Sequence, residues 1–401
     1  MSVNPVEFDE ENEFRHWLSK YDPADQAPDE LLCRFINGIN QLGINVYRSG
    51  MWFPTAHPEL WGTYIAWTLR EGAKIFRPNY DTQSTSTFLN SPGEAVYTQR
   101  KALRWRLYTE ESLPFPMLED IKKEGGTDYL IVPFLTDHAD EVPWISFVTK
   151  RAEGFSKLEI NTLKEFCEPL SWKARVTMAE IANKSLLTVY LGENAAQRVI
   201  DGAFKRGTGE QINAIIWFCD LRGFTNLGDT YSSEELVEIL DQYFECIAGP
   251  IEDAGGEILK FIGDAILAIF PLTESPKEAC ENALVAAEQS LSSLAAWSQQ
   301  PIAEARPRLE AGIALHIGNV FFGNIGGRSR LDFTVIGSAV NEASSLESHC
   351  KNSYPLLVTK EFQQHHGENK LTSIGKKELK GINKEREIFT LTTMAQKIDI
   401  Q

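Results

Sequence analysis

The sequence predicts an α+β protein of two domains, and three observations lead to this prediction. At 401 residues the chain is longer than one hydrophobic core usually serves, and about 150 residues per domain favours two domains. Hydrophobic residues make up 43% of the chain, which is enough to bury a sizeable core. Strand-sized apolar stretches and longer stretches of helical periodicity occur in both halves.

The charge and the cysteines narrow the class of protein. A net charge of −17 opposes binding to nucleic acid or to an anionic membrane, and a nucleotide substrate would need metal cations. The six cysteines include no C-x-x-C pair, so we expect neither a zinc site nor a disulfide framework, and we expect a reducing cytoplasm. No apolar run reaches the roughly 18 residues of a membrane span, and residues 1–13 lack the layout of a signal peptide.

The first half predicts a helix, several strands and a second helix. Residues 1–28 are polar and acidic with three prolines, which is typical of a flexible lead-in. From Asp29 the apolar residues recur at helical spacing, and a second amphipathic stretch covers 157–172. The predicted strands are 44–53, 64–68, 129–134 and 144–149.

This order of elements, closed by a helix after Gly154-Phe155-Ser156, resembles a GAF domain over about residues 29–175. The resemblance implies a GAF-like α+β regulatory or dimerisation domain that binds a small ligand or another subunit. Its effector is unknown, and a packing module without a ligand is the alternative. Residues 176–212 then predict a helical connector with one break, or a plain linker.

Two aspartates in the second half follow or join predicted strands. Asp220 follows the buried stretch 214–219 and precedes a glycine turn, and Asp264 sits in a Gly-Asp turn between two apolar strands. Each alone is more typical of a turn or a helix cap. Together, two aspartates at neighbouring strand ends can hold two cations about 3.5–4 Å apart, the spacing used for phosphoryl displacement.

Three motifs in order and in register then resemble the signatures of class III adenylate and guanylate cyclases, over about 180 residues. They are Phe218-x-Asp220-x-x-Gly223-Phe224-Thr225, Lys260-Phe261-Ile262-Gly263-Asp264 and Asp332-Phe333-Thr334-Val335-Ile336-Gly337-x-x-Val340-Asn341. The resemblance implies a ferredoxin-like cyclase domain at residues 213–393, followed by a tail at 394–401. It further implies a head-to-tail homodimer that converts ATP to 3′,5′-cyclic AMP and pyrophosphate.

The resemblance also implies how metals and phosphates are held. Asp220 and Asp264 correspond to the ligands of two divalent ions, Mg²⁺ or Mn²⁺. The backbone amides of Gly223, Phe224 and Thr225 correspond to a phosphate cradle at the start of a helix.

The same resemblance assigns the nucleoside contacts. Lys260 and Thr334 correspond to the pair that reads N1 and the N6 amino group of adenine, which favours ATP over GTP. Thr334 also marks the branch of the family that responds to bicarbonate, so bicarbonate stimulation is a hypothesis. Asn341 corresponds to the residue that orients the ribose, and Lys380 to a contact of the terminal phosphate.

One position departs from the family pattern. Ser345 stands where the family has an arginine that stabilises charge on the α-phosphate. Losing such a donor typically costs roughly 2.7–4 kcal/mol, or about 10² to 10³ in rate, so weak activity is expected. Arg328 and Arg330 are candidate substitutes. The alternatives are a catalytically silent nucleotide-binding regulatory subunit and a cyclase for another nucleotide.

Overall fold

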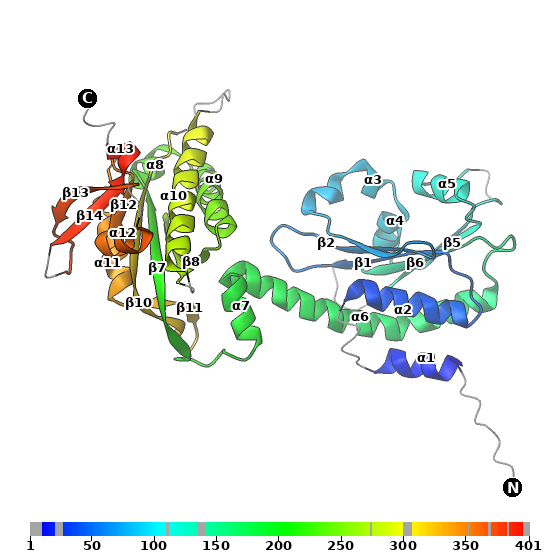
Figure 1. The fold of residues 1–401 in the computed structure, drawn as a ribbon. Coiled ribbons are helices and arrows are strands. Elements are labelled where there is room, and N and C mark those ends of the chain that lie inside the picture. The colour runs from blue at the N-terminus through cyan, green and yellow to red at the C-terminus, as the bar shows by residue number, and fades with distance from the viewer. Residues whose placement is uncertain are drawn as a thin grey trace, which may run out of the picture. The chain divides into compact units, whose positions relative to one another are not determined.

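The protein is described by a computed structural model that covers residues 10–20, 27–109, 112–134, 142–272, 275–299, 307–351, 353–367, 370–382 and 385–395. It divides into two compact units, Met1–Leu186 and Leu187–Gln401, each with its own sheet and helices (Figure 1). The mixture of helix and strand confirms the predicted α+β class. Across the described ranges, no helix combines the length and hydropathy that crossing a bilayer requires.

The N-terminal sheet has six antiparallel strands in the order β3-β2-β1-β6-β5-β4. Their bounds are Arg48–Pro54 (β1), Gly62–Thr68 (β2), Gly72–Phe76 (β3), Leu103–Arg106 (β4), Asp128–Pro133 (β5) and Trp144–Thr149 (β6). The four predicted strands correspond to β1, β2, β5 and β6, which are largely buried. The two edge strands were not predicted, because β3 and β4 are short and contain no fully buried residue.

Helices cover both faces of this sheet (Figure 1). The long helices α2 (Pro28–Gln41) and α6 (Lys157–Leu191) pack on one face through residues such as Phe35 and Phe166. The other face carries a 3-10 turn, η2 (Tyr80–Ser84), and the short helices α3 (Ser86–Leu89), α4 (Pro92–Gln99) and α5 (Pro116–Lys123). Helix α2 confirms the amphipathic helix predicted from Asp29.

The prediction of a flexible lead-in over residues 1–28 is wrong for part of that range. Residues Glu10–Ser19 form helix α1, and its Phe14 and Leu18 are buried in the same core as α2 and α6. The ring of Phe14 lies 5.1 Å from that of Phe166, and Gly38 leaves room for it, since a Cβ there would lie 2.3 Å from the ring. The acidic composition of this segment drew attention away from Phe14 and Leu18, whose i, i+4 spacing places them on one face of a helix. Residues 1–9 and 21–26 fall outside the described ranges.

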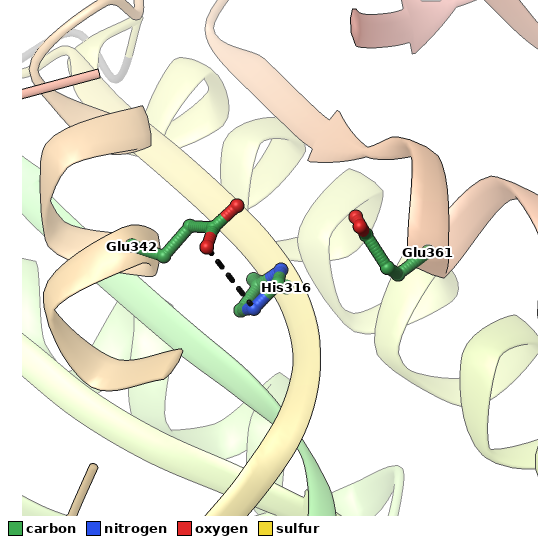
Figure 2. A group of neighbouring side chains, drawn as sticks. All are labelled: His316, Glu342 and Glu361. Carbon is green, nitrogen blue, oxygen red and sulfur yellow. Dashed lines mark ion pairs between the residues drawn. The ribbon is translucent and has the colours of Figure 1, made fainter. Parts of the chain in front are cut away.

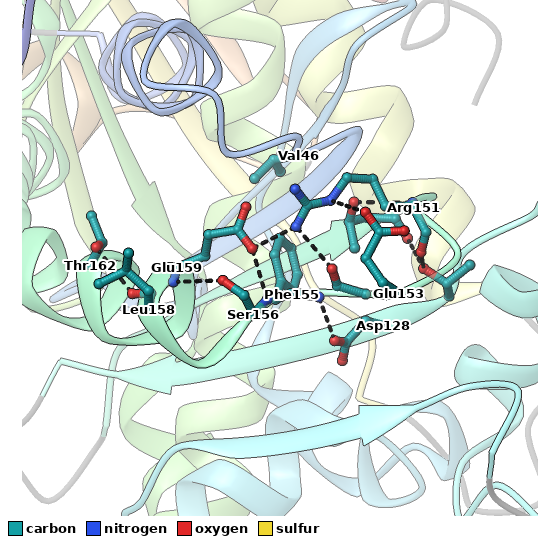
Figure 3. A network of polar contacts seen from close by, with 12 residues as sticks. Val46, Asp128, Arg151, Glu153, Phe155, Ser156, Leu158, Glu159 and Thr162 are labelled. Atoms are coloured by element: carbon teal, nitrogen blue, oxygen red, sulfur yellow. Dashed lines mark hydrogen bonds and ion pairs between the residues drawn. The ribbon is translucent and has the colours of Figure 1, made fainter.

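A polar network fixes where α6 begins (Figure 3). The N–H of Ser156 donates to Glu159 Oε2 at 2.7 Å, and the N–H of Glu159 donates to the Ser156 hydroxyl at 3.2 Å, which is a reciprocal cap. Arg151 pairs with Glu159 at 2.5 Å, and the N–H of Phe155 donates to the buried carboxylate of Asp128 at 2.8 Å. Helix α6 therefore starts after Ser156, as the sequence predicts.

Helix α6 extends well beyond the predicted end at residue 172. It spans 35 residues with Pro169 inside it, and Gly192, at φ 83°, separates it from α7 (Glu193–Ile200). Strand β7 then begins at Gly209, earlier than the predicted domain start at residue 213. The first residues of β7 are polar, so the apolar pattern of the sequence did not identify them as part of the strand, although they pair with β10.

The C-terminal sheet has the order β13-β14-β12-β10-β7-β9-β8, with β11 paired to β10. Its strands are Gly209–Leu221 (β7), Glu257–Ile262 (β8), Ala265–Pro271 (β9), Ala311–Gly326 (β10), Leu331–Ile336 (β11), Leu356–Thr359 (β12), Leu371–Lys377 (β13) and Arg386–Leu391 (β14). The series β7-α9-β8-β9-α10-β10 has the β-α-β-β-α-β order of the ferredoxin-like fold that the resemblance implies.

Helices again pack on both faces of the sheet. Side chains of β7 alternate, with Trp217 in the core shared with α9 (Ser233–Asp253), α10 (Pro276–Ser298) and α12 (Lys360–His366). Ile216 faces the core shared with α7 and α11 (Ser338–Glu347). The remaining helices are α8 (Phe224–Thr230) and α13 (Thr392–Ala395). Ser232 and Glu235 form a capping box at the start of α9, a pattern that can be recognised from the sequence spacing.

We expect Phe14→Ala to lower the free energy of unfolding of the N-terminal unit by about 3 kcal/mol, because it removes a buried ring and leaves a cavity. Urea unfolding followed by tryptophan fluorescence measures this. The exposed neighbour Glu13→Ala is the control and should unfold as the wild type. Equal stability of the two variants would show that α1 is not part of the core.

Candidate active site

The two aspartates singled out by sequence lie together at one end of the C-terminal sheet. Asp220 is the penultimate residue of β7, and Asp264 lies in the turn that joins β8 to β9. Strands β7 and β9 are antiparallel neighbours with Cys219 opposite Ile266, so the end of β7 lies beside that turn. The two carboxyl groups are within hydrogen-bonding reach of each other.

The surroundings of this pair favour a cation. Burial, followed by the neighbouring charge of Asp264, raises the pKa of Asp220 to about 6. Two half-buried carboxylates side by side repel each other until a proton or a metal ion lies between them. Carboxylate oxygens are the ligands that Mg²⁺ and Mn²⁺ prefer, so this donor set fits divalent metals of that kind.

A partly buried ion pair borders the aspartates, and sequence analysis missed it. Arg222 Nη2 lies 2.6 Å from Glu347 Oε1, at the end of α11, and also donates to the Glu347 carbonyl at 3.2 Å. Gly312, opposite Asp220 in the β7–β10 pairing, makes room, since a Cβ there would lie 2.1 Å from Arg222 Nη2. The one signal in the sequence was the position of Arg222 inside the Asp220 motif.

Glu347 is affected by the same environment. Burial, together with the charges of Asp220 and Asp264, raises the pKa of Glu347 to about 7 against the opposing effect of Arg222. Three carboxyl groups thus share one end of the sheet with one arginine. The excess of negative charge there reinforces the preference for a metal cation.

The predicted phosphate-binding turn follows directly. Gly223 has φ 73°, a left-handed conformation that glycine adopts without a steric cost, and it precedes the first residue of α8. Phe224 packs against the core, whereas Thr225 is exposed. The turn therefore connects the strand that carries Asp220 to a short helix at the surface.

The two predicted base-reading residues lie on adjacent elements. Lys260 on β8 reaches strand β11, where its Nζ lies 3.0 Å from Asp332 Oδ2, two residues before Thr334. Thr334 is 5% exposed, and its Oγ1 finds no hydrogen-bond partner among the described residues. A buried hydroxyl without a partner costs free energy unless a ligand satisfies it.

The other predicted residues occupy different surroundings. On α11, Asn341 is exposed, and Ser345 is buried with an Oγ that has no hydrogen-bond partner among the described residues. Lys380 is exposed in the turn between β13 and β14. Arg328 and Arg330 lie in the β10–β11 turn, and the Arg330 Nε is 3.7 Å from Asp332 Oδ1.

A second group of potential metal ligands, far apart in the sequence, was also missed. One ligand atom each from His316 (β10), Glu342 (α11) and Glu361 (α12) lies within 4.8 Å of the others. Figure 2 shows the two carboxylates on opposite sides of the imidazole. Burial lowers the pKa of His316, which favours the neutral ring. Arg386 lies 2.7 Å from Glu342, so this glutamate already has a cationic partner.

Comparisons with known proteins agree on this part of the chain. Residues 209–393 match the family of adenylate and guanylate cyclase catalytic domains. An adenylate cyclase of Anabaena cylindrica is 38% identical over 233 residues, which cover 58% of this chain and 43% of the relative. A terminal-differentiation specific adenylate cyclase of Dictyostelium discoideum is 30% identical over 182 residues, which cover 45% of this chain and 8% of the relative.

Among solved structures, the adenylyl cyclase CyaB of P. aeruginosa is similar at 26% identity and a TM-score of 0.42, covering 46% of this chain and 96% of that one. The present chain spans less than half the length of the two curated relatives.

We expect Mn²⁺ binding, measured by electron paramagnetic resonance, to be about tenfold weaker at pH 5 than at pH 7. The pKa of Asp220 is raised to about 6, so the carboxyl is ionised above that pH and protonated below it, where the proton competes with the metal. Asp229→Asn, at an exposed aspartate on α8, should keep the same profile. A constant affinity between pH 5 and 7 would contradict the assignment.

Proposed function

We propose that residues 209–393, which match the family of adenylate and guanylate cyclase catalytic domains, form a class III nucleotide cyclase domain that converts ATP to 3′,5′-cyclic AMP and pyrophosphate. The observation that carries this proposal is the close approach of Asp220 and Asp264 at the ends of neighbouring strands. Both residues lie inside the matched range. The names of the two relatives, both adenylate cyclases, support ATP as the substrate.

The proposed reaction assigns a role to each of the site residues. Asp220 and Asp264 would hold two ions, Mg²⁺ or Mn²⁺, which supply activation of the ribose 3′-hydroxyl and neutralisation of the triphosphate. The turn of Gly223 to Thr225 follows directly after Asp220 and Arg222, and its backbone amides would bind phosphate oxygens. Asn341, exposed on α11, would orient the ribose, and the exposed ammonium of Lys380 would contact the terminal phosphate.

Adenine recognition rests on Lys260 and Thr334. The ammonium of Lys260 donates to N1 of adenine, and the hydroxyl of Thr334 accepts from the N6 amino group. Guanine carries an N–H donor at N1, which could not accept a hydrogen bond from the ammonium of Lys260. The unsatisfied hydroxyl of Thr334 and the contact of Lys260 with Asp332, two residues away, support this pairing.

We further propose that the active site forms between two copies of this chain, arranged head to tail. Apolar side chains stay exposed on β8 and at the end of β11: Phe261 is 51% exposed, Ile262 48% and Ile336 53%. A second copy would remove this surface from water. In such a pair, the metal-binding aspartates of one copy would face the base-reading residues of the other.

The N-terminal unit would then be a GAF-like regulatory or dimerisation domain of a cytoplasmic enzyme. Its support is the sheet order β3-β2-β1-β6-β5-β4 with long helices on one face. The sequence order of helix, strands and closing helix also supports it.

Ser345 favours a second function, a catalytically silent nucleotide-binding subunit. It occupies the place of the expected arginine, and a neutral hydroxyl cannot supply the charged fork that stabilises the α-phosphate. This subunit would bind ATP without releasing cyclic AMP.

We expect the purified chain with Mn²⁺ to form cyclic AMP from ATP, and Asp220→Ala and Asp264→Ala each to reduce turnover at least about 10³-fold, because each removes a metal ligand. Chromatography of the products from ATP, GTP, CTP and UTP measures this. Asp229→Ala, at an exposed aspartate on α8, is the control and should retain activity. ATP binding without any product would identify the silent subunit instead.

Restoring the arginine tests the role of residue 345. We expect Ser345→Arg to raise kcat about 10-fold or more with a smaller change in KM, because the new guanidinium acts on charge that develops in the transition state. Ser348→Arg, one turn further along, should leave kcat unchanged. A loss of activity in Ser345→Arg with normal ATP binding would show that this buried position has been remodelled for another purpose.

A further inference from the structure

The second group of potential metal ligands, His316, Glu342 and Glu361, has no part in the proposed nucleotide chemistry. The three residues come from different elements, β10, α11 and α12, and one ligand atom of each lies within 4.8 Å of the others. His316 is 5% exposed and Glu342 is 6% exposed, so most of the group is enclosed by the C-terminal unit. Carboxylates held in such a place need compensating contacts or a bound cation.

The distance between the imidazole and Glu342 suits an ion between them. His316 Nε2 lies 3.9 Å from Glu342 Oε2, which is too long for a hydrogen bond, and this nitrogen has no hydrogen-bond partner among the described residues. Zn²⁺ binds nitrogen and oxygen ligands at about 2.0–2.2 Å, which places two such atoms about 3.4 Å apart at a tetrahedral angle. A closing movement of about half an ångström by the glutamate would complete the bridge.

Glu361 approaches the same imidazole from the other side (Figure 2). Its Oε2 is buried and accepts no hydrogen bond from the described residues. A buried carboxylate oxygen without a donor costs free energy, and a bound cation would remove that cost. The unsatisfied atoms of His316 and Glu361 thus belong to one small region of the fold.

The contacts around these ligands are those that orient ligands in metal sites. The Thr359 hydroxyl lies 3.0 Å from His316 Nδ1, which leaves Nε2 to face Glu342. Thr359 is the N-cap of α12, yet its side chain makes no capping hydrogen bond. Arg386 Nε lies 2.7 Å from Glu342 Oε1, and its Nη2 donates to Oε2 at 3.2 Å. A carboxylate oxygen has two acceptor positions, so Oε2 keeps one for an ion.

We propose that His316, Glu342 and Glu361 bind one Zn²⁺ ion, with water as the fourth ligand. One nitrogen and two oxygen donors from the protein match the open four-coordinate arrangement of zinc. Imidazole favours Zn²⁺ or Co²⁺ over Mg²⁺, which prefers oxygen ligands, so this site and the Asp220–Asp264 pair would select different metals. The ion would join β10, α11 and α12, and its binding does not require cyclase activity.

A titration of the full chain with Co²⁺ in excess Mg²⁺ tests this proposal. The Mg²⁺ occupies sites made of oxygen ligands, and four-coordinate Co²⁺ absorbs visible light much more strongly than six-coordinate Co²⁺. We expect the absorption to saturate at one Co²⁺ per chain and to disappear when Zn²⁺ displaces the cobalt. A titration without this strong absorption would overturn the proposal.

Variants of the ligands locate the bound ion. His316→Gln and Glu342→Gln should each weaken Co²⁺ binding at least about a hundredfold, because each removes a ligand. His365→Gln and Glu378→Gln, at exposed positions, are the matched controls and should bind as the wild type. Unchanged affinity in His316→Gln would refute the assignment.

Two further variants separate this site from its alternatives. Asp220→Ala should keep the Co²⁺ absorption, whereas its loss there would assign the ion to the aspartate pair. Thr359→Val keeps all three ligands and removes only the outer contact of the ring, so we expect about tenfold weaker binding. This variant decides the question if His316→Gln does not fold, since unchanged affinity in Thr359→Val would then count against the site. The assay measures binding alone, so its outcome is separate from that of the cyclase test.

Discussion

The antiparallel pairing of β7 with β10 is the constraint on which the candidate active site depends. All 13 residues of β7 pair with β10, from Leu221 opposite Ala311 to Gly209 opposite Gly323. This register places Asp220 opposite Gly312, the one residue type that leaves space for the Arg222–Glu347 pair. A shift by one residue would exchange the two faces of β7, sending Trp217 and Ile216 to the wrong cores and Asp220 away from Asp264.

The charges at this end of the sheet follow from that geometry. Burial and the neighbouring carboxylates raise the pKa values of Asp220 and Glu347 to about 6 and about 7, although Arg222 lowers both. A single arginine does not offset three carboxyl groups, so the site attracts cations in its folded form. Ser345 stands where the resemblance to class III cyclases implies an arginine, and its neutral hydroxyl adds no positive charge. In the proposed site, divalent metals would therefore carry more of the charge stabilisation than they would beside an arginine.

Much of the secondary structure was predictable because the periodic spacing of apolar residues on a buried face can be recognised within one short segment of sequence. Helix α2, the strands β1, β2, β5 and β6, and the capping box at Ser232 and Glu235 all follow from patterns within single segments. The edge strands β3 and β4 escaped prediction because pairing with a neighbour, and not burial, holds them. Helix α1 was missed for a related reason. Its buried Phe14 packs against Phe166 and fits beside Gly38, and both of these residues are distant in the sequence.

For the candidate active site, the sequence by itself determined which residue types stand at which spacing. It placed Asp220 at a strand end, Asp264 in a turn, and Ser345 where an arginine was expected. Only the tertiary structure decided which groups share an environment: that Asp220 meets Asp264, that Arg222 pairs with Glu347, and that the hydroxyl of Thr334 is buried without a partner. The reason is physical, since pKa shifts and unsatisfied donors depend on burial and on through-space distances between elements that are remote along the chain.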